Sequence, residues 1–211
     1  DQSWPSLSAA EFIAAEARAR PGKLVVLCFS PLTNVALAGL LEPRLPQLLR
    51  ALVVMGGSVY RPGNAAPLAE ANFHHDSLAA RTVVRMFGGS GATAPLVLAP
   101  LDLTHDVMFG PDTIKAVAAL GGAARLFAEA WPVYQSAYCT LGGLCDGAPL
   151  HDAHPVAWLL EPTIYSKMAE MLMDVHVAPP GDPTDGMCLV DQRRTPTGSA
   201  GSRVLVLLDV D

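Results

Sequence analysis

Two short segments of the chain carry side chains suited to ligand binding and proton transfer. The first runs from Met55-Gly56-Gly57 through Gly63-Asn64 to Glu70-Ala71-Asn72, in a Gly- and Pro-rich stretch that follows an apolar run. Its amides and carboxylate are the donors and acceptors that a polyhydroxylated ligand such as a sugar requires. The second, Leu150-His151-Asp152-Ala153, places an imidazole, a proton donor, beside a carboxylate, which is a ligand for hard metal ions.

Each of these residues also has a structural interpretation. Asp152 can cap the helix that it begins, and the local sequence alone favours that role. A lone histidine such as His151 is usually structural. Asn64, Glu70 and Asn72 can hold turns, because short polar side chains bond readily to nearby backbone.

The elements that must position these residues follow a regular alternation. Strands are expected over residues 24–29, 51–55 and 95–99, and helices over 8–20, 31–42 and 76–87, with Ser30 capping the second helix. Further on, helices are expected over 111–120, 123–138 and 151–160, and strands over 172–177, 187–191 and 203–208. The alternation up to about residue 100 predicts a mostly parallel sheet with helices on its faces.

Ligands bind at the carboxyl ends of strands in such open sheets. Phe29-Ser30 and Met55-Gly56-Gly57 both lie at expected strand ends. The polar segments and the topology therefore indicate one place for the site.

Composition excludes several classes of protein. Half of the 211 residues are apolar and the mean hydropathy is +0.32, but the longest uncharged run, residues 24–41, contains Pro31 at its centre and predicts a strand, a turn and a helix. The net charge of −6 argues against nucleic acid or an anionic membrane as a partner. The four cysteines lack zinc-site spacing. Cys28 and Cys188 lie in apolar runs, and such buried free thiols favour a reducing, cytoplasmic location.

Four segments, in order and at matching spacing, resemble the nucleoside hydrolase family, the inosine-uridine preferring nucleoside N-ribohydrolases. They are Ser30-Pro31-Leu32-Thr33-Asn34-Val35-Ala36, Met55-Gly56-Gly57 with its Asn64, Glu70 and Asn72, Pro100-Leu101-Asp102-Leu103-Thr104, and Pro149-Leu150-His151-Asp152-Ala153. The resemblance implies one nucleoside-hydrolase-like domain over residues 1–211, an α/β fold with a Rossmann-like open sheet.

The resemblance also implies a reaction, the hydrolysis of the N-glycosidic bond of a ribonucleoside to ribose and free base. It implies that a calcium ion is bound by Asp152 and by the carbonyl of Phe29. Asn64, Glu70 and Asn72 would bind the ribose hydroxyls, and His151 would protonate the departing base. A neutral-range pKa of His151 would suit that role.

Three apolar or aromatic residues have two open interpretations each. Met55 either lines the ribose pocket or belongs to the core. Tyr134 and Tyr138 lie four residues apart, so they share one helix face, which is either a packing face or a wall that stacks on the base. Related enzymes place aromatic residues from this region on the base.

The chain also departs from the family pattern. The family's opening strand with an aspartate cluster, D-x-D-x-G-x-D-D, does not occur, so we expect a truncated, partial domain that is inactive by itself. The alternative is a non-catalytic fragment or a nucleoside-binding relative without the N-terminal metal site. Ala71 replaces an aromatic residue often found there, which favours uridine or mixed specificity. A homodimer or homotetramer is expected from the resemblance.

Overall fold

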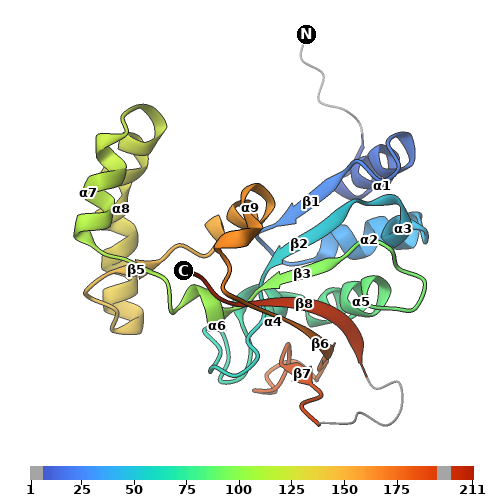
Figure 1. Cartoon of the computed structure of the whole chain (residues 1–211). Helices are drawn as coiled ribbons and strands as arrows, with labels where there is room; N and C mark the ends of the chain where they lie inside the picture. Colours follow the sequence, from blue (N-terminus) through green and yellow to red (C-terminus); the bar gives the residue numbers. More distant parts are fainter. Residues whose placement is uncertain (1–6, 194–200) are drawn as a thin grey trace.

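A computed structural model describes residues 7–193 and 201–211 and contains one six-stranded sheet with helices on both faces (Figure 1). The strands are β1 (Val25–Cys28), β2 (Ala51–Met55), β3 (Leu96–Ala99), β6 (Lys167–Val175), β7 (Cys188–Val190) and β8 (Ser202–Asp209). The helices are α1 (Ala9–Ala19), α2 (Thr33–Leu41), α3 (Leu45–Leu48), α4 (Ala71–His75), α5 (Ser77–Phe87), α6 (Leu101–Thr104), α7 (Pro111–Ala119), α8 (Gly122–Gly142) and α9 (Ala153–Leu160), with a short 3₁₀ turn at Pro162–Ile164. Two short strands, β4 (Met108–Phe109) and β5 (Ala148–Pro149), form a separate antiparallel pair.

The sheet has the strand order β1-β2-β3-β8-β6-β7. The β1–β2, β2–β3 and β3–β8 pairs are parallel, whereas β6 runs antiparallel to both β8 and β7. This confirms the expected mostly parallel α/β sheet. Since β1, β2 and β3 are parallel, the segments that follow them leave the sheet at the same edge.

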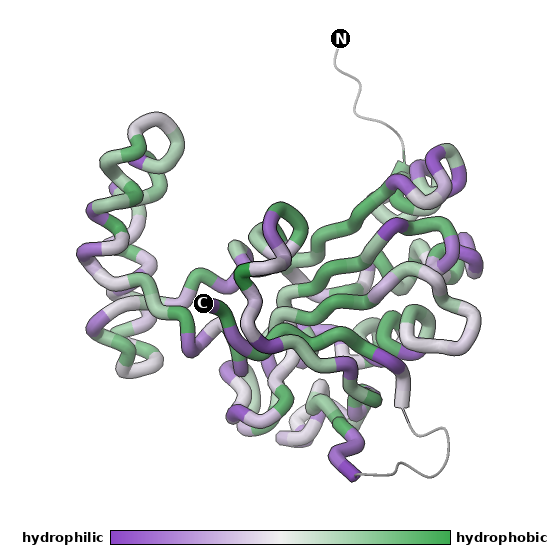
Figure 2. Tube along the Cα trace, in the orientation of Figure 1, coloured by the Kyte–Doolittle hydropathy of each residue, from purple (hydrophilic) through white to green (hydrophobic). Residues whose placement is uncertain are grey.

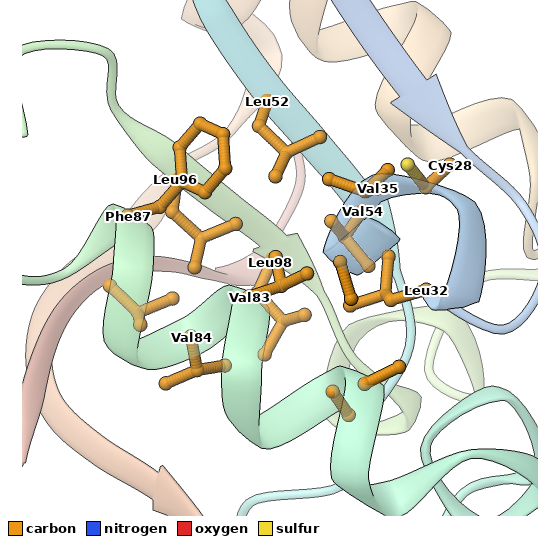
Figure 3. Packing of buried hydrophobic residues seen from close by; sticks show 14 of the residues in the cluster. Cys28, Leu32, Val35, Leu52, Val54, Val83, Val84, Phe87, Leu96 and Leu98 are labelled. Carbon is orange, nitrogen blue, oxygen red and sulfur yellow. The ribbon is translucent and has the colours of Figure 1, made fainter. Parts of the chain in front are cut away.

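Successive residues of the central strands face opposite sides of the sheet, as the period of two requires. Leu52 and Val54 of β2 pack with α2 and α5, as Figure 3 shows for part of this cluster. Ala51 and Val53 face the other side, where they pack with Leu103 of α6 and with α9. The hydropathy tube of Figure 2 shows the apolar strands at the centre of the molecule. Both faces of the sheet are thus buried, which accounts for the apolar composition.

Helices α7 and α8 form a hairpin that stands to one side of the sheet (Figure 1). A small cluster of Ile114, Trp131 and Ala148 packs inside the hairpin and against its β4–β5 base. The 21-residue helix α8 contains Pro132, and its C-cap residue, Gly143, has a φ of 71°. Glycine is the residue that adopts this left-handed C-terminal conformation without strain.

Several predicted boundaries were wrong. Helix α2 begins at Thr33, with Leu32 at the N-cap position and no side-chain cap, so Ser30 does not cap it. Leu32 is 1% exposed, and its burial fixes the turn in place of a polar cap. Strand β6 begins earlier than predicted, because it pairs with β8 over most of its length. Helix α8 continues to Gly142, four residues beyond the predicted end at Tyr138.

The cysteines fall into two groups. Cys28 and Cys188 are buried free thiols, as predicted. Cys139 and Cys145 form a disulfide that the sequence analysis did not anticipate. A disulfide is uncommon in reducing compartments, so the cysteines together do not support the cytoplasmic location inferred from the buried thiols alone. None of the described helices is long and apolar enough to cross a membrane.

Candidate functional site

A cavity of about 410 Å³ lies where the end of β2 meets α8 and the start of α9. Its size is typical of pockets for small molecules. It is lined by all of the predicted site residues except Phe29: Met55, Asn64, Glu70, Asn72, Tyr134, Tyr138, His151 and Asp152. Residues far apart in the sequence, such as Met55 and Asp152, therefore meet in one cavity.

Glu70 organises the loop that follows β2. The residue is 2% exposed, and its carboxylate accepts hydrogen bonds from the backbone N–H groups of Gly57 at 2.9 Å, Asn72 at 2.9 Å and Phe73 at 3.2 Å. It thereby caps the short helix α4 and ties the loop back to the strand end. Burial raises the pKa of Glu70, although the three N–H donors act in the opposite direction.

Gly57 makes this arrangement possible. Its φ is 76°, and a Cβ atom there would lie 2.9 Å from the sulfur of Cys188. A larger residue would therefore be strained by its backbone and would clash with the core. The turn after β2 depends on glycine at this position.

Asn64 and Asn72 each use one amide atom for structure. The Asn64 Oδ1 accepts from the N–H of Ala71 at 2.9 Å, and the Asn72 Nδ2 donates to the carbonyl of Met55 at 3.0 Å. Among the described residues, the Asn64 Nδ2 and the Asn72 Oδ1 make no hydrogen bond. One donor and one acceptor thus remain for the hydroxyl groups of a ligand.

Asp102 of α6 holds the same loop from the other side. This residue is 7% exposed, and its carboxylate accepts from the N–H groups of Val59 and Tyr60, both at 2.7 Å. The aspartate of the Pro100-Leu101-Asp102-Leu103-Thr104 segment is therefore a brace for the loop rather than a lining residue of the cavity.

His151 is held by two hydroxyl groups. Its Nδ1 lies 2.7 Å from the Oγ1 of Thr104, and its Nε2 lies 2.7 Å from the hydroxyl of Tyr138. The ring of His105 packs against it with centroids 5.3 Å apart. Burial, and secondly the neighbouring His105 and His154, lower the pKa of His151 to about 4. The expectation of a neutral-range pKa was therefore wrong, because sequence alone does not show burial.

Helix α8 contributes an aromatic wall. Phe127, Trp131, Tyr134 and Tyr138 all line the cavity, and neighbouring rings along this series lie 4.9–5.6 Å apart. The Tyr134 hydroxyl donates to the carbonyl of Pro149 at 2.9 Å. Burial, and secondly the Tyr138 hydroxyl, raise the pKa of Tyr134.

The sequence analysis named only the two tyrosines of this wall. Phe127 and Trp131 were missed, although their spacing of four, three and four residues through Tyr134 to Tyr138 is the spacing of one helix face. Thr104 was quoted in a motif but received no role.

Asp152 occupies the N-cap position of α9, yet its side chain makes no capping hydrogen bond. The structural interpretation of this residue is therefore not supported. Its carboxylate borders the cavity, and burial raises its pKa. Phe29 is 40% exposed and is not among the lining residues.

The described residues do not complete a calcium site. Calcium takes roughly six to eight oxygen ligands. Within residues 7–193 and 201–211 no group of three or more His, Cys, Asp or Glu side chains is arranged to hold a metal ion. Glu70, the other lining carboxylate, is engaged with backbone N–H groups. The donor set present here thus falls short of what this ion needs.

The fold and the cavity define an α/β protein whose pocket, at the carboxyl edge of its parallel strands, combines amide and carboxylate side chains with an aromatic wall. The family model described as inosine-uridine preferring nucleoside hydrolase matches residues 3–211, and the chain belongs to this family.

Relatives and solved structures agree with this assignment. The chain is 33% identical to the pyrimidine-specific ribonucleoside hydrolase RihA of Klebsiella pneumoniae, over 97% of this chain and 62% of that protein. It is 32% identical to the non-specific ribonucleoside hydrolase RihC of Salmonella enteritidis, over 90% of this chain and 58% of that protein. The structure of a purine-preferring ribonucleoside hydrolase from Gardnerella vaginalis superimposes with a TM-score of 0.82 and 28% identity, over 98% and 62% of the two chains. The chain thus spans about three-fifths of the length of these relatives.

Proposed function

We propose that the protein hydrolyses the N-glycosidic bond of ribonucleosides. The observation that carries this proposal is the cavity, which is lined both by hydroxyl-binding groups from the loop after β2 and by an aromatic wall from α8. In the net reaction, water adds to C1′, the electron pair of the C1′–N bond goes to the base, and the base nitrogen gains a proton. Membership of the family supports the reaction class.

The residues divide between the two halves of the substrate. The free amide atoms of Asn64 and Asn72, together with Glu70, bind the ribose hydroxyls and fix the sugar. Met55 forms the apolar floor of this half. The aromatic residues of α8 stack on the base. Because both ring nitrogens of His151 are bonded to hydroxyl groups, His151 acts on the base through Tyr138.

A product assay tests the proposal. The full-length protein, incubated with uridine, cytidine, inosine and guanosine, should release free base and ribose in equal amounts. Tyr138→Phe should slow the release, whereas Tyr60→Phe, on an exposed tyrosine that does not line the cavity, should not. Tight binding of nucleosides without release would instead favour the alternative, a nucleoside-binding relative that does not turn over.

For the base we propose uridine or mixed specificity. The grounds are Ala71, which leaves the sugar end of the cavity without an aromatic side chain at this position, and the two tyrosines of the wall. The relatives described above include a pyrimidine-specific, a non-specific and a purine-preferring enzyme. A ratio of kcat/KM that favours inosine and guanosine over uridine would contradict this proposal.

Calcium binding by Asp152 remains a proposal that rests on its carboxylate and on the family resemblance. The described residues do not complete a site for the ion. Calorimetric titration of the full-length protein with CaCl₂ should show binding that Asp152→Ala abolishes. Equal affinity in both proteins would exclude Asp152 as a ligand.

The expected homodimer or homotetramer is likewise a proposal from the resemblance. Sedimentation velocity of the full-length protein measures the mass in solution, and a purely monomeric species across the micromolar range would contradict it.

A further inference from the structure

Thr104 contacts His151 at the ring nitrogen opposite the one that Tyr138 contacts. Thr104 ends α6, is 0% exposed, and places its Oγ1 2.7 Å from the Nδ1 of His151. On the other side of the ring, the Nε2 lies 2.7 Å from the Tyr138 hydroxyl. A neutral imidazole has one N–H donor and one acceptor nitrogen, so the two hydroxyls must play opposite roles.

Two arrangements of hydrogens satisfy the ring. In the first, Thr104 donates to Nδ1, and the Nε2–H donates to the oxygen of Tyr138. In the second, the Nδ1–H donates to Thr104, and the Tyr138 hydroxyl donates to Nε2. The two arrangements differ in where the proton of Tyr138 lies, because only the first releases that proton from the His151 ring.

The burial of Thr104 decides between them. Among the described residues, its Oγ1 has no hydrogen-bond partner other than His151. Thr82 and Thr140, by contrast, donate to the carbonyl four residues earlier in their helices. In the second arrangement the Thr104 proton would be buried without an acceptor, which costs about 1–3 kcal/mol. In the first arrangement the Thr104 hydroxyl and the His151 Nε2–H both have acceptors, and the Tyr138 hydroxyl faces the cavity.

We propose that Thr104 is a positioning residue that fixes His151 as the Nε2–H tautomer and thereby leaves the hydroxyl proton of Tyr138 directed at the bound ligand. The Nε2–H then donates to the Tyr138 oxygen while the hydroxyl proton of Tyr138 is shared with the departing base. The His105 ring packs against the His151 ring, with centroids 5.3 Å apart, and limits its rotation. This inference rests on the proposed function for its ligand but on the geometry of the free protein for the tautomer.

The tautomer is measurable without turnover. In protein labelled with ¹⁵N-histidine, pyrrole-type and pyridine-type nitrogens resonate far apart, and His151→Gln assigns the signals of this ring. The wild-type protein near pH 7.5 should show a pyrrole-type Nε2 and a pyridine-type Nδ1. Thr104→Val, which replaces the hydroxyl by a methyl group of similar size, should lose this single tautomer. Thr104→Ser, which restores the hydroxyl, should retain it.

Kinetics then separate positioning from general damage. Thr104→Val should lower kcat on nucleosides by about tenfold or more with little change in KM, and should scarcely affect an activated nitrophenyl riboside, whose leaving group needs no proton. Thr104→Ser should recover most of the loss. Thr140→Val, on a threonine outside the cavity, is the matched control.

Each result bears on one proposal. A pyrrole-type Nδ1 in the wild-type protein, or an unchanged tautomer in Thr104→Val, overturns the role of Thr104. The predicted tautomers in a protein that releases no base from any nucleoside leave the role of Thr104 standing and overturn the proposed function instead. If Thr104→Val does not fold, the wild-type spectrum and Thr104→Ser still decide the tautomer.

Discussion

Glu70 accepts hydrogen bonds from three backbone N–H groups while it lines the substrate cavity. Its structural and proposed ligand-binding roles therefore cannot be separated by removing the side chain. The more informative change is Glu70→Gln, which keeps the shape but replaces one acceptor oxygen by an NH₂ donor that opposes an N–H group.

We expect Glu70→Gln to lower the free energy of unfolding by about 1–3 kcal/mol, because a buried donor would be left without an acceptor. It should also lower kcat/KM for every nucleoside alike. Asn64→Ala is the comparison, since Asn64 is exposed and makes one hydrogen bond to the loop. Asn64→Ala should lower the free energy of unfolding by less than about 1 kcal/mol, yet it should lower kcat/KM for the same substrates. Urea unfolding and kinetics measure both effects, and a Glu70→Gln protein as stable as wild type would contradict the assignment.

The four cysteines should differ sharply in reactivity. Burial raises the pKa of Cys28 and of Cys188 to about 12, so neither thiol forms a thiolate at neutral pH. Cys139 and Cys145 are joined. We expect the native, unreduced protein to show almost no reaction with a disulfide reagent such as Ellman's, and brief treatment with a dithiol reductant to expose two reactive thiols. A rapid reaction before reduction would contradict the burial or the disulfide.

The types of the site residues could be read from the sequence, but their interactions could not. Met55, Asn64, Glu70, Asn72, Tyr134, Tyr138, His151 and Asp152 were named from motifs and lie in one cavity. The bond between Thr104 and His151 joins residues 47 positions apart, and no local pattern signals such a contact. The pKa of His151 depends on burial that only the packed fold creates. Phe29 does not line the cavity, and the metal-binding role of its carbonyl stays a prediction.

At the scale of elements, the loop after β2 is held between its own Glu70 and Asp102 of α6. The Asp102 carboxylate accepts two short hydrogen bonds, from N–H groups 42 and 43 positions earlier in the chain. This brace ties the loop that carries Asn64 to the segment that carries Thr104. Loss of the brace should therefore disturb both halves of the cavity.

We expect Asp102→Ala to destabilise the protein by about 2–3 kcal/mol, because the N–H groups of Val59 and Tyr60 lose a charged acceptor in a part-buried position. Asp106→Ala is a matched control four residues away. The Asp106 side chain is 55% exposed and pairs with Arg61 at the surface, where such a pair contributes about 0–1 kcal/mol. Chemical unfolding of both variants gives the comparison. Equal losses would show that Asp102 is an ordinary surface carboxylate.

Elements with strong local signals were predicted closely, and those fixed by distant contacts were not. The apolar run Ala51–Met55 coincides with β2, and the capping box of Ser8 and Glu11 begins α1 where expected. The start of α2 was misplaced because burial of Leu32 outweighs a possible Ser30 cap. The first residues of β6 are largely exposed, so their strand conformation depends on pairing with β8.

At the scale of the whole molecule, the two free thiols occupy the main core on one face of the sheet. Cys28 ends β1 and Cys188 begins β7, at opposite edges, and both belong to the same buried cluster. Ionisation of either thiol would place a charge in an apolar interior. The stability of the sheet as a unit is therefore coupled to the protonation of these two residues.

The coupling predicts a loss of stability in alkaline solution. Each thiol has a pKa raised from 9.0 to about 12 in the folded protein, so between these values the unfolded chain releases protons that the folded protein retains. Stability is thus fully present below pH 9 and falls as pH rises towards 12, by about 1.4 kcal/mol per pH unit for each thiol.

Urea unfolding at pH 8 to 11 should show this slope, and Cys28→Ala should reduce it by about one thiol's share. Replacing both Cys139 and Cys145 by Ala should leave the slope unchanged, because a disulfide does not titrate in this range. An identical slope with and without Cys28 would show that this thiol is accessible to water in the folded protein.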